Sequence, residues 1–419
     1  MIEVTTPERL GLSSVRLLKL TDWLDQQVSR GRLAGASVLV GRRGKVGYVG
    51  TAGVTDLESG DPFSENAVVR AYSMTKPIVT VAAMMLYEDG CFQLDDPVSK
   101  YLPEFSETPV WVGGEISNVV PISSPMLVWH IMSHTSGLTY GFMQQNVVDA
   151  RYRTVGLDRR GAHANLAEWT QALAGIPLIC QPGSQWNYSV STDVLGRLVE
   201  VWSGMSLDQF LEERIFAPLG MVDTGFMVKP GAEERLVTLY EPEVGAGLGG
   251  INQVPSEQRR GLKVLEKPEK STFLAMPKVL SGGGGLVSTL ADYSRFCQAM
   301  LNGGELDNFR LLSPITVRHM RTNHLPDGKD MAQMGQPVWS ETSYDGIGFG
   351  LGFAVVLDPI KAAIVASPGE HHWGGAASTF FWLDPLEDLW VVFLTQLLPS
   401  STYPLRRELR VRVYQSIID

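Results

Sequence analysis

The stretch at 78–86, Ile-Val-Thr-Val-Ala-Ala-Met-Met-Leu, is apolar on every side. A helix of that composition has no face to present to water, so it must lie buried inside the molecule. Gly90 follows shortly afterwards, and a glycine just past a helix end commonly takes the left-handed cap position. The rest of the chain therefore has to fold around this segment.

A serine and a lysine stand at the N-terminal mouth of this helix, in Ser73-Met74-Thr75-Lys76. Positions i and i+3 share one face of a helix, so we expect the Lys76 amine near the Ser73 hydroxyl. A serine becomes a good nucleophile when a neighbouring base takes its proton, and a lysine serves as that base when burial lowers its pKa. Pro77 would clash with the Ser73 carbonyl inside a helix, which places Ser73 at or just before the first turn. The alternative is a capping serine and a surface lysine, because Ser-x-x-Lys alone is a common pattern.

The pattern around this helix predicts strands at both ends of the chain and helices in the middle. Strand patterns occupy residues 37–40, 45–49, 348–357, 362–366, 378–383 and 389–394. Further helical patterns occupy residues 17–28, 126–132, 166–173, 193–202, 289–301, 313–321 and 405–418. The polar, glycine-rich segment 245–270 is expected to be a loop.

This distribution favours an α/β fold of the α+β type, in which an antiparallel sheet is flanked by helices and a second lobe is mainly helical. Residues 1–90 and 281–419 are expected to form one discontinuous α/β domain. Residues 91–280 are expected to form the mainly helical domain.

Two further stretches carry groups suited to catalysis. Tyr188 lies between the turn at 181–183 and a predicted helix. A tyrosine relays a proton when a neighbouring cation stabilises its phenolate. The sequence His-Trp-Gly-Gly-Ala at 372–376 precedes a predicted strand, where glycines let a ligand approach backbone N–H groups that stabilise an oxyanion. The alternatives are a half-buried aromatic residue and an edge turn.

Composition narrows the function classes. The net charge of −10 argues against nucleic acid and anionic membrane surfaces as partners, because both attract basic patches. No apolar run has the length of a membrane span and the start lacks a signal-peptide pattern, so we expect a cytoplasmic protein. The cysteines Cys91, Cys180 and Cys297 are widely spaced, and none pairs with a histidine at metal-ligand spacing. Neither a disulfide framework nor a metal or cofactor is expected.

A Ser-His-Asp hydrolase is the main alternative among nucleophilic enzymes, since the chain has seven histidines. The chain contains no Gly-x-Ser-x-Gly motif, which disfavours an α/β-hydrolase. The stretch His-Thr-Ser-Gly at 134–137 is interpreted as a structural turn. The four glycines at 282–285 are not followed by Gly-Lys-Ser/Thr, so no phosphate loop is expected there.

Taken in order, these stretches resemble the serine β-lactamase-like superfamily over nearly the whole chain. Within it they resemble the class C-related branch, which holds the family VIII carboxylesterases and the lovastatin-type acyltransferases. Ser73-Met74-Thr75-Lys76 looks like the first family motif, and the segment 94–105 looks like the one that follows it. The stretches 134–138 and 282–289 look like two further family landmarks.

The resemblance implies roles for individual residues. Tyr188 stands at the tyrosine of the family's Tyr-x-Asn motif, and Trp373-Gly374-Gly375 stands where β-lactamases carry Lys-Thr-Gly. Ser73 would be the nucleophile, with Lys76 and Tyr188 sharing the proton transfers. The backbone N–H groups of Ser73 and Ala376 would hold the oxyanion.

Two departures from the family pattern bear on the substrate. Val190 replaces the Asn of Tyr-x-Asn, and Trp373 replaces the Lys that would meet a β-lactam carboxylate. Both changes favour neutral esters, and the Trp-Gly-Gly form is associated with the esterase branch. The candidates for substrate binding, with core packing as the alternative for each aromatic side chain, are Trp186, Tyr140, Phe142, Trp373, Gly374 and Gly375.

The sequence therefore predicts a serine carboxylesterase whose partner is a small, short-acyl-chain ester and whose intermediate is a covalent acyl-Ser73. An acyltransferase using the same acyl-enzyme, a weak β-lactamase or D-Ala-D-Ala peptidase, and a non-catalytic binding protein on the same fold are the alternatives. Oligomeric state stays open, and so does the choice between Lys76 and Tyr188 as the base in acylation.

Overall fold

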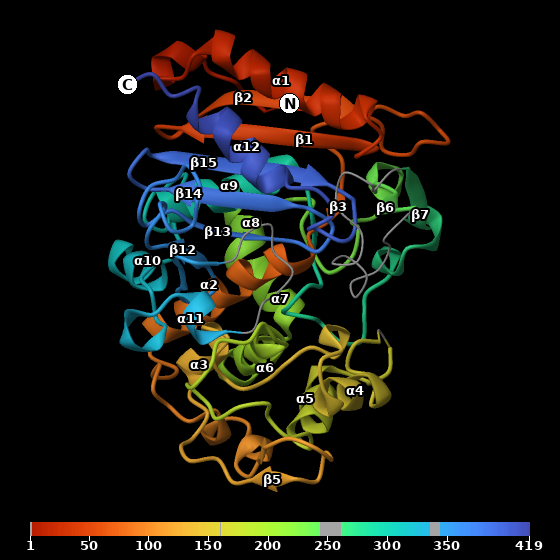
Figure 1. Ribbon diagram of the computed structural model, residues 1–419. Helices are drawn as coiled ribbons and strands as arrows, with labels where there is room; N and C mark the ends of the chain where they lie inside the picture. The colour runs from red at the N-terminus through yellow and green to blue at the C-terminus, as the bar shows by residue number, and fades with distance from the viewer. Residues whose placement is uncertain (1, 160, 244–260, 336–343) are drawn as a thin grey trace.

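A seven-stranded antiparallel sheet forms the upper part of the molecule, with the strand order β11-β12-β13-β14-β15-β1-β2 (Figure 1). This computed structural model describes residues 2–159, 161–243, 261–335 and 344–419. The strands of the sheet are β1 (Gly35–Arg42), β2 (Lys45–Gly53), β11 (Ile347–Phe349), β12 (Ala354–Val356), β13 (His371–Gly374), β14 (Phe380–Asp384) and β15 (Leu389–Thr395). Because β1 pairs with β15, the two ends of the chain share one sheet, as the sequence predicted.

Helices cover both faces of this sheet. Successive side chains of a strand point to opposite faces, and the apolar side chains on each face need to be shielded from water. The helices α1 (Ser14–Ser29) and α12 (Leu405–Tyr414) cover one face, where Val38 and Val40 of β1 belong to the same cluster as Trp23. The intervening Leu39 belongs to the cluster on the other face, with α2 (Thr75–Glu88) and α9 (Leu290–Leu301).

The second lobe is mainly helical and lies below the sheet (Figure 1). Its helices are α3 (Val128–Met132), α4 (Val147–Thr154), α5 (Leu166–Ala174), α6 (Ser191–Ser203), α7 (Leu207–Leu211) and α8 (Ala217–Leu219). The helix α2 lies between this lobe and the sheet, and residues 75–86 are buried without interruption, as its apolar sequence requires.

The remaining elements are short and connect the two lobes or border them. The two-stranded pairs are β3 (Val69–Arg70) with β8 (Val287–Ser288), β4 (Val110–Trp111) with β5 (Val119–Val120), β6 (Leu239–Pro242) with β7 (Leu262–Glu266), and β9 (Glu305–Leu306) with β10 (Phe309–Arg310). Two short helices are α10 (Pro314–Met320) and α11 (Met331–Met334).

Several local predictions were wrong, each for a physical reason. Residues 362–366 form turns rather than a strand, because Asp358 accepts hydrogen bonds from the backbone of Ile360 and Lys361 and folds the chain back. The strand expected at 348–357 is interrupted between β11 and β12, where Gly352 takes a φ of +84°. Most of the predicted loop 245–270 lies outside the described residues, but its last part forms strand β7.

The strand β13 was also missed, because the sequence His-His-Trp-Gly has neither alternation nor β-branched residues. It is not an edge turn but an internal strand, paired with β12 on one side and β14 on the other.

One hydrophobic cluster runs from the sheet through α2 to α6, so the two lobes share a core. The domain boundaries at 90/91 and 280/281 stay a prediction. Among the described residues, none of the helices combines the length and the apolar character that crossing a bilayer requires.

Candidate active site

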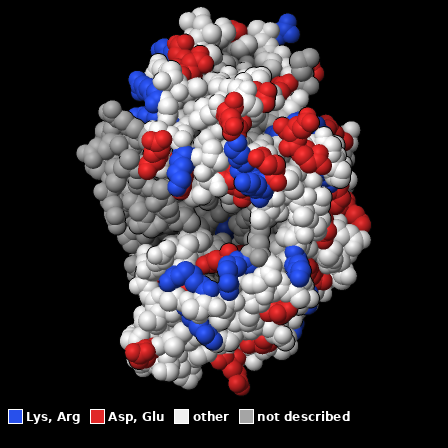
Figure 2. Space-filling view, turned by 90° about the vertical axis from the view of Figure 1, so that its right-hand side faces the viewer, with Lys and Arg blue, Asp and Glu red and all other residues white. Residues whose placement is uncertain are grey.

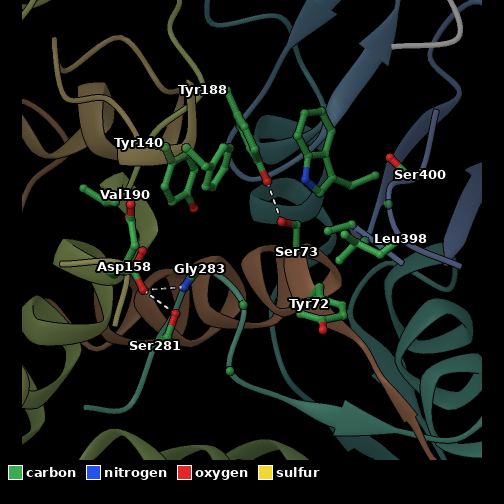
Figure 3. Close-up of a pocket in the computed structure, with 18 of the residues that line it drawn as sticks. Tyr72, Ser73, Tyr140, Asp158, Tyr188, Val190, Ser281, Gly283, Leu398 and Ser400 are labelled. Atoms are coloured by element: carbon green, nitrogen blue, oxygen red, sulfur yellow. Dashed lines mark hydrogen bonds between the residues drawn. The ribbon is translucent and has the colours of Figure 1, made fainter. Parts of the chain in front are cut away.

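Ser73 lies in a single 3-10 turn, Tyr72–Met74, that leads directly into α2. This agrees with the position that Pro77 imposes just inside the helix. Tyr72 has a φ of +46°, a left-handed conformation that costs a residue with a side chain about 1–2 kcal/mol. The strained residue turns the chain immediately before the serine, and the Ser73 hydroxyl faces the cavity between the lobes (Figure 3).

Lys76 is almost fully buried, with 1% of its surface exposed. Its Nζ atom lies 3.3 Å from Ser73 Oγ, 2.8 Å from the Tyr140 hydroxyl and 2.7 Å from the Gly283 carbonyl oxygen. The amine is therefore surrounded by three hydrogen-bonding groups, and the helical i, i+3 spacing brings it to the serine as predicted.

Tyr188 reaches Ser73 from the opposite side of the cavity (Figure 3). Its hydroxyl donates to Ser73 Oγ at 2.5 Å, and the Lys76 Nζ atom lies 4.6 Å from the centre of the Tyr188 ring. The serine oxygen thus contacts both groups that the sequence proposed for proton transfer.

The turn at 134–138 supports Tyr188 from behind. The Asn187 amide side chain donates to the Leu138 carbonyl at 2.7 Å, and the Asn187 backbone N–H donates to the His134 carbonyl at 2.8 Å. The His134 ring packs 5.1 Å from the Tyr188 ring. Burial, with the Lys76 amine nearby, lowers the pKa of His134 well below its usual range, so this ring is neutral. The turn is structural, and it holds the tyrosine in place.

The cavity in front of Ser73 has a volume of about 430 Å³ and opens between the two lobes. On the surface the opening is a hollow with side chains of both charges around it (Figure 2). Among the residues predicted to bind substrate, those that line the cavity are Tyr140, Phe142, Trp373, Gly374 and Gly375, together with Ala376. Val190 lines it too, and Leu157 and Trp169 extend its apolar wall.

Trp186 does not line the cavity, contrary to the prediction. It is 1% exposed and stacks on Tyr188 with the ring centres 6.4 Å apart, and the Phe349 ring lies 5.8 Å from it. Tyr188 lines the cavity and Trp186 does not, so the tyrosine is the member of this stacked pair that faces the substrate space.

The glycines at the end of β13 line the cavity and are also required by packing within the protein. A methyl group at Gly374 would lie 2.4 Å from the Arg406 guanidinium, which donates to the carbonyls of Gly375 and Thr379 at 3.3 Å each. One at Gly375 would lie 2.4 Å from the Ala71 carbonyl. Both glycines are therefore needed for close packing within the protein, in addition to any role in admitting a ligand.

The polar groups that surround Lys76 beyond Ser73 were not predicted from the sequence. Tyr140, predicted only as a pocket residue, contacts the lysine through its hydroxyl. The carboxylate of Asp193 accepts hydrogen bonds from Ser281 and from the Gly283 backbone N–H. The sequence shows both Asp193, at the start of a predicted helix, and the four glycines at 282–285. Their distance from Lys76 along the chain gives no indication that they lie near it.

Among the described residues, the side-chain hydrogen-bond partners of Ser73 are Lys76 and Tyr188, with no histidine among them. A Ser-His-Asp arrangement at this serine is therefore excluded. The geometry instead provides a serine nucleophile, an amine and a phenol in mutual contact, which is suited to acyl transfer through a covalent intermediate.

A family model described as Beta-lactamase matches residues 20–415. The chain belongs to the Beta-lactamase family. Esterase EstB from Burkholderia gladioli is 33% identical over 97% of this chain and 98% of its own length. Lovastatin esterase from Penicillium rubens is 28% identical over 86% of this chain and 88% of its own length. Among solved structures, EstCE1, described as a hydrolase with promiscuous acyltransferase activity, is 29% identical with a TM-score of 0.77, covering 96% of this chain and 99% of that one.

These findings confirm the resemblance inferred from the motifs, including the branch of esterases and lovastatin-type enzymes. They also confirm the predicted fold class, since the structural relative shares nearly the whole chain. At the coarse level, this Beta-lactamase family member is a serine hydrolase of the kind that cleaves esters or transfers acyl groups.

Proposed function

We propose that the protein is a serine carboxylesterase that hydrolyses small, short-acyl-chain esters through a covalent acyl-Ser73 intermediate. The observation that carries this proposal is the Ser73 oxygen, which lies 2.5 Å from the Tyr188 hydroxyl and 3.3 Å from the Lys76 amine on the cavity wall. Such contacts give a serine the neighbouring base that it needs to attack a carbonyl carbon.

In the proposed acylation step, Ser73 Oγ bonds to the ester carbonyl carbon while its proton passes to the Lys76–Tyr188 pair. The carbonyl oxygen becomes an oxyanion and accepts hydrogen bonds from the backbone N–H groups of Ser73 and Ala376, both of which line the cavity. The tetrahedral adduct then expels the alkoxide, which takes the proton back from the pair. Water repeats the sequence on the acyl-enzyme, releasing the acid and restoring Ser73.

Charged side chains such as Asp158 and Arg406 line part of the cavity, but its apolar part supports a neutral, apolar substrate. A volume of about 430 Å³ is at the small end of the range for small-molecule sites. Val190 and Trp373 place apolar groups where the β-lactamase motifs carry an amide and a cation. The aromatic side chains of Tyr140 and Phe142, which stack with ring centres 4.4 Å apart, add a flat wall beside Lys76.

The experiment is intact-mass spectrometry of the protein mixed with a slow p-nitrophenyl ester, with Ser73→Ala measured alongside. We expect a mass increase equal to the acyl group in the wild-type protein and none in the variant. Hydrolysis that continues in Ser73→Ala without any adduct would refute the proposal. Lys76→Ala and Tyr188→Phe are each expected to lower kcat by at least about 100-fold, the low end for a general acid–base group.

Acyl transfer to an alcohol is the second candidate, because it shares the acyl-Ser73 intermediate and differs only in the acceptor. It is supported by EstCE1, the structural relative described as a hydrolase with promiscuous acyltransferase activity. Product analysis in the presence of a competing alcohol separates the two: a transferase forms the new ester in preference to the free acid. A β-lactamase or D-Ala-D-Ala peptidase is disfavoured by Val190 and Trp373, and rapid turnover of a chromogenic cephalosporin would revive it.

A further inference from the structure

Asp193 is a buried carboxylate on the wall of the catalytic cavity, outside the Ser73–Lys76–Tyr188 group. It is the third residue of α6, it is 5% exposed, and it lines the cavity. Its Oδ1 atom accepts hydrogen bonds from the Ser281 hydroxyl at 2.5 Å and from the Gly283 backbone N–H at 3.0 Å. A carboxylate taken out of water needs such partners, and the first turn of a helix adds to them.

Gly283 connects this carboxylate to the catalytic lysine. Its N–H donates to Asp193, and its carbonyl oxygen accepts from Lys76 Nζ at 2.7 Å. A methyl group at position 283 would lie 2.4 Å from Asp193 Oδ2 and 2.9 Å from the Tyr140 hydroxyl. Glycine is therefore required at this position. Without a side chain, its N–H can donate to Asp193 while its carbonyl oxygen accepts from Lys76.

We propose that Asp193 is a positioning residue for Lys76: its carboxylate fixes the Gly283 carbonyl against the amine and places a negative charge near the Lys76–Tyr188 pair. This inference rests on the proposed function, because it assigns Asp193 a role in holding the amine that serves Ser73. It is independent of which ester the enzyme hydrolyses.

The charge has a measurable consequence at the catalytic pair. The titratable groups that interact with Asp193 are Lys76, Tyr140 and Asp158. The two hydrogen bonds through Gly283 keep the carboxylate and the amine within about 9 Å, where opposite charges in a protein interact strongly enough to move a pKa by about one unit. We therefore expect the Asp193 charge to raise the pH at which Ser73 becomes reactive.

The experiment measures the rate at which a p-nitrophenyl alkylphosphonate labels Ser73, between about pH 5 and about pH 10, by intact mass. In the wild-type protein the rate rises as the catalytic pair loses its proton. Asp193→Asn keeps an acceptor oxygen for Gly283 but removes the charge, so we expect the midpoint of this rise to move about one pH unit lower. Ser281→Ala removes a neutral donor only, and its midpoint should stay at the wild-type pH.

Asp193→Ala removes the charge and the acceptor together, so the plateau rate should also fall by at least about tenfold. If Asp193→Asn does not fold, as thermal unfolding will show, Asp193→Glu takes its place. The glutamate keeps the charge, so its midpoint must stay at the wild-type pH while the plateau falls. A shifted midpoint in Asp193→Glu, or profiles of wild type and Asp193→Asn that superimpose, would overturn the inference.

These results are separable from a failure of the proposed function. A protein that is labelled at Ser73 but hydrolyses no ester refutes the proposed esterase and still reports the Asp193 effect. A protein that hydrolyses esters with the same pH midpoint in Asp193→Asn refutes the positioning role and leaves the esterase intact.

Discussion

Replacing Tyr140 by phenylalanine removes one hydroxyl from the immediate surroundings of the catalytic amine. Lys76 Nζ has three hydrogen-bonding neighbours, and Tyr140 is the one at 2.8 Å. Water is a poor substitute, because the lysine side chain is 1% exposed. A hydrogen bond to a charged group is worth about 1.5–3 kcal/mol, which corresponds to about 10- to 150-fold in rate if the bond orients Lys76 in the transition state.

The ring of residue 140 keeps its stacking on Phe142 in this variant, so substrate binding should change little. We therefore expect kcat for a p-nitrophenyl ester to fall by about 10- to 150-fold with KM nearly constant. Tyr240→Phe is the matched control, because it removes a buried hydroxyl that accepts from the Leu57 N–H, outside the cavity. Kinetic constants of Tyr140→Phe equal to those of the control, at equal thermal stability, would show that this hydroxyl does not orient the lysine.

Two further predictions test the glycine run and the buried charges. Gly283→Ala should lower ester hydrolysis at least about tenfold, because the added methyl group would lie 2.4 Å from a carboxylate oxygen, whereas Gly284→Ala, with its nearest neighbour at 3.7 Å, should retain activity. Equal rates in the two variants would contradict this reasoning. Burial opposes ionisation of Glu370, but the Arg410 guanidinium beside it and His372 lower its pKa to about 2. Since this pKa is depressed from 4.5, the stabilisation is present at neutral pH and is lost as pH falls from about 4.5 to about 2, a change of about 3 kcal/mol. Glu370→Gln should be less stable at neutral pH and lack this acid-dependent loss, as urea unfolding at about pH 7 and about pH 3 will show; an unchanged pH dependence would exclude Glu370 as its source.

Much of the architecture and the central contact were predictable from the sequence. The apolar segment behind Lys76 could only be a buried helix, and helical geometry then placed the lysine beside Ser73. The position of Tyr188 followed from the resemblance rather than from any periodicity. In the structure its hydroxyl reaches the serine from a segment 115 positions away along the chain.

The groups that surround Lys76 could not be predicted, because they depend on tertiary contacts between loops. Tyr140 lies 64 positions from the lysine in sequence, and the Gly283 carbonyl lies 207 positions away. A backbone carbonyl also has no sequence signature. Trp186 was misplaced for a related reason: an aromatic residue beside a catalytic tyrosine is equally suited to the cavity and to the core, and the tertiary contacts with residues such as Phe349 decide between them.

The burial of α2 separates the reactive groups from the parts of the chain that determine substrate choice. Ser73 and Lys76 are anchored to a helix enclosed by both lobes, whereas much of the cavity wall comes from loops and from the start of α12. Laboratory evolution towards new esters should therefore accumulate substitutions at 141–143, at 155–159 and around 398–407, and leave 75–86 nearly unchanged. An enzyme of this design can exchange one substrate for another at its periphery while the nucleophile and its amine keep their geometry.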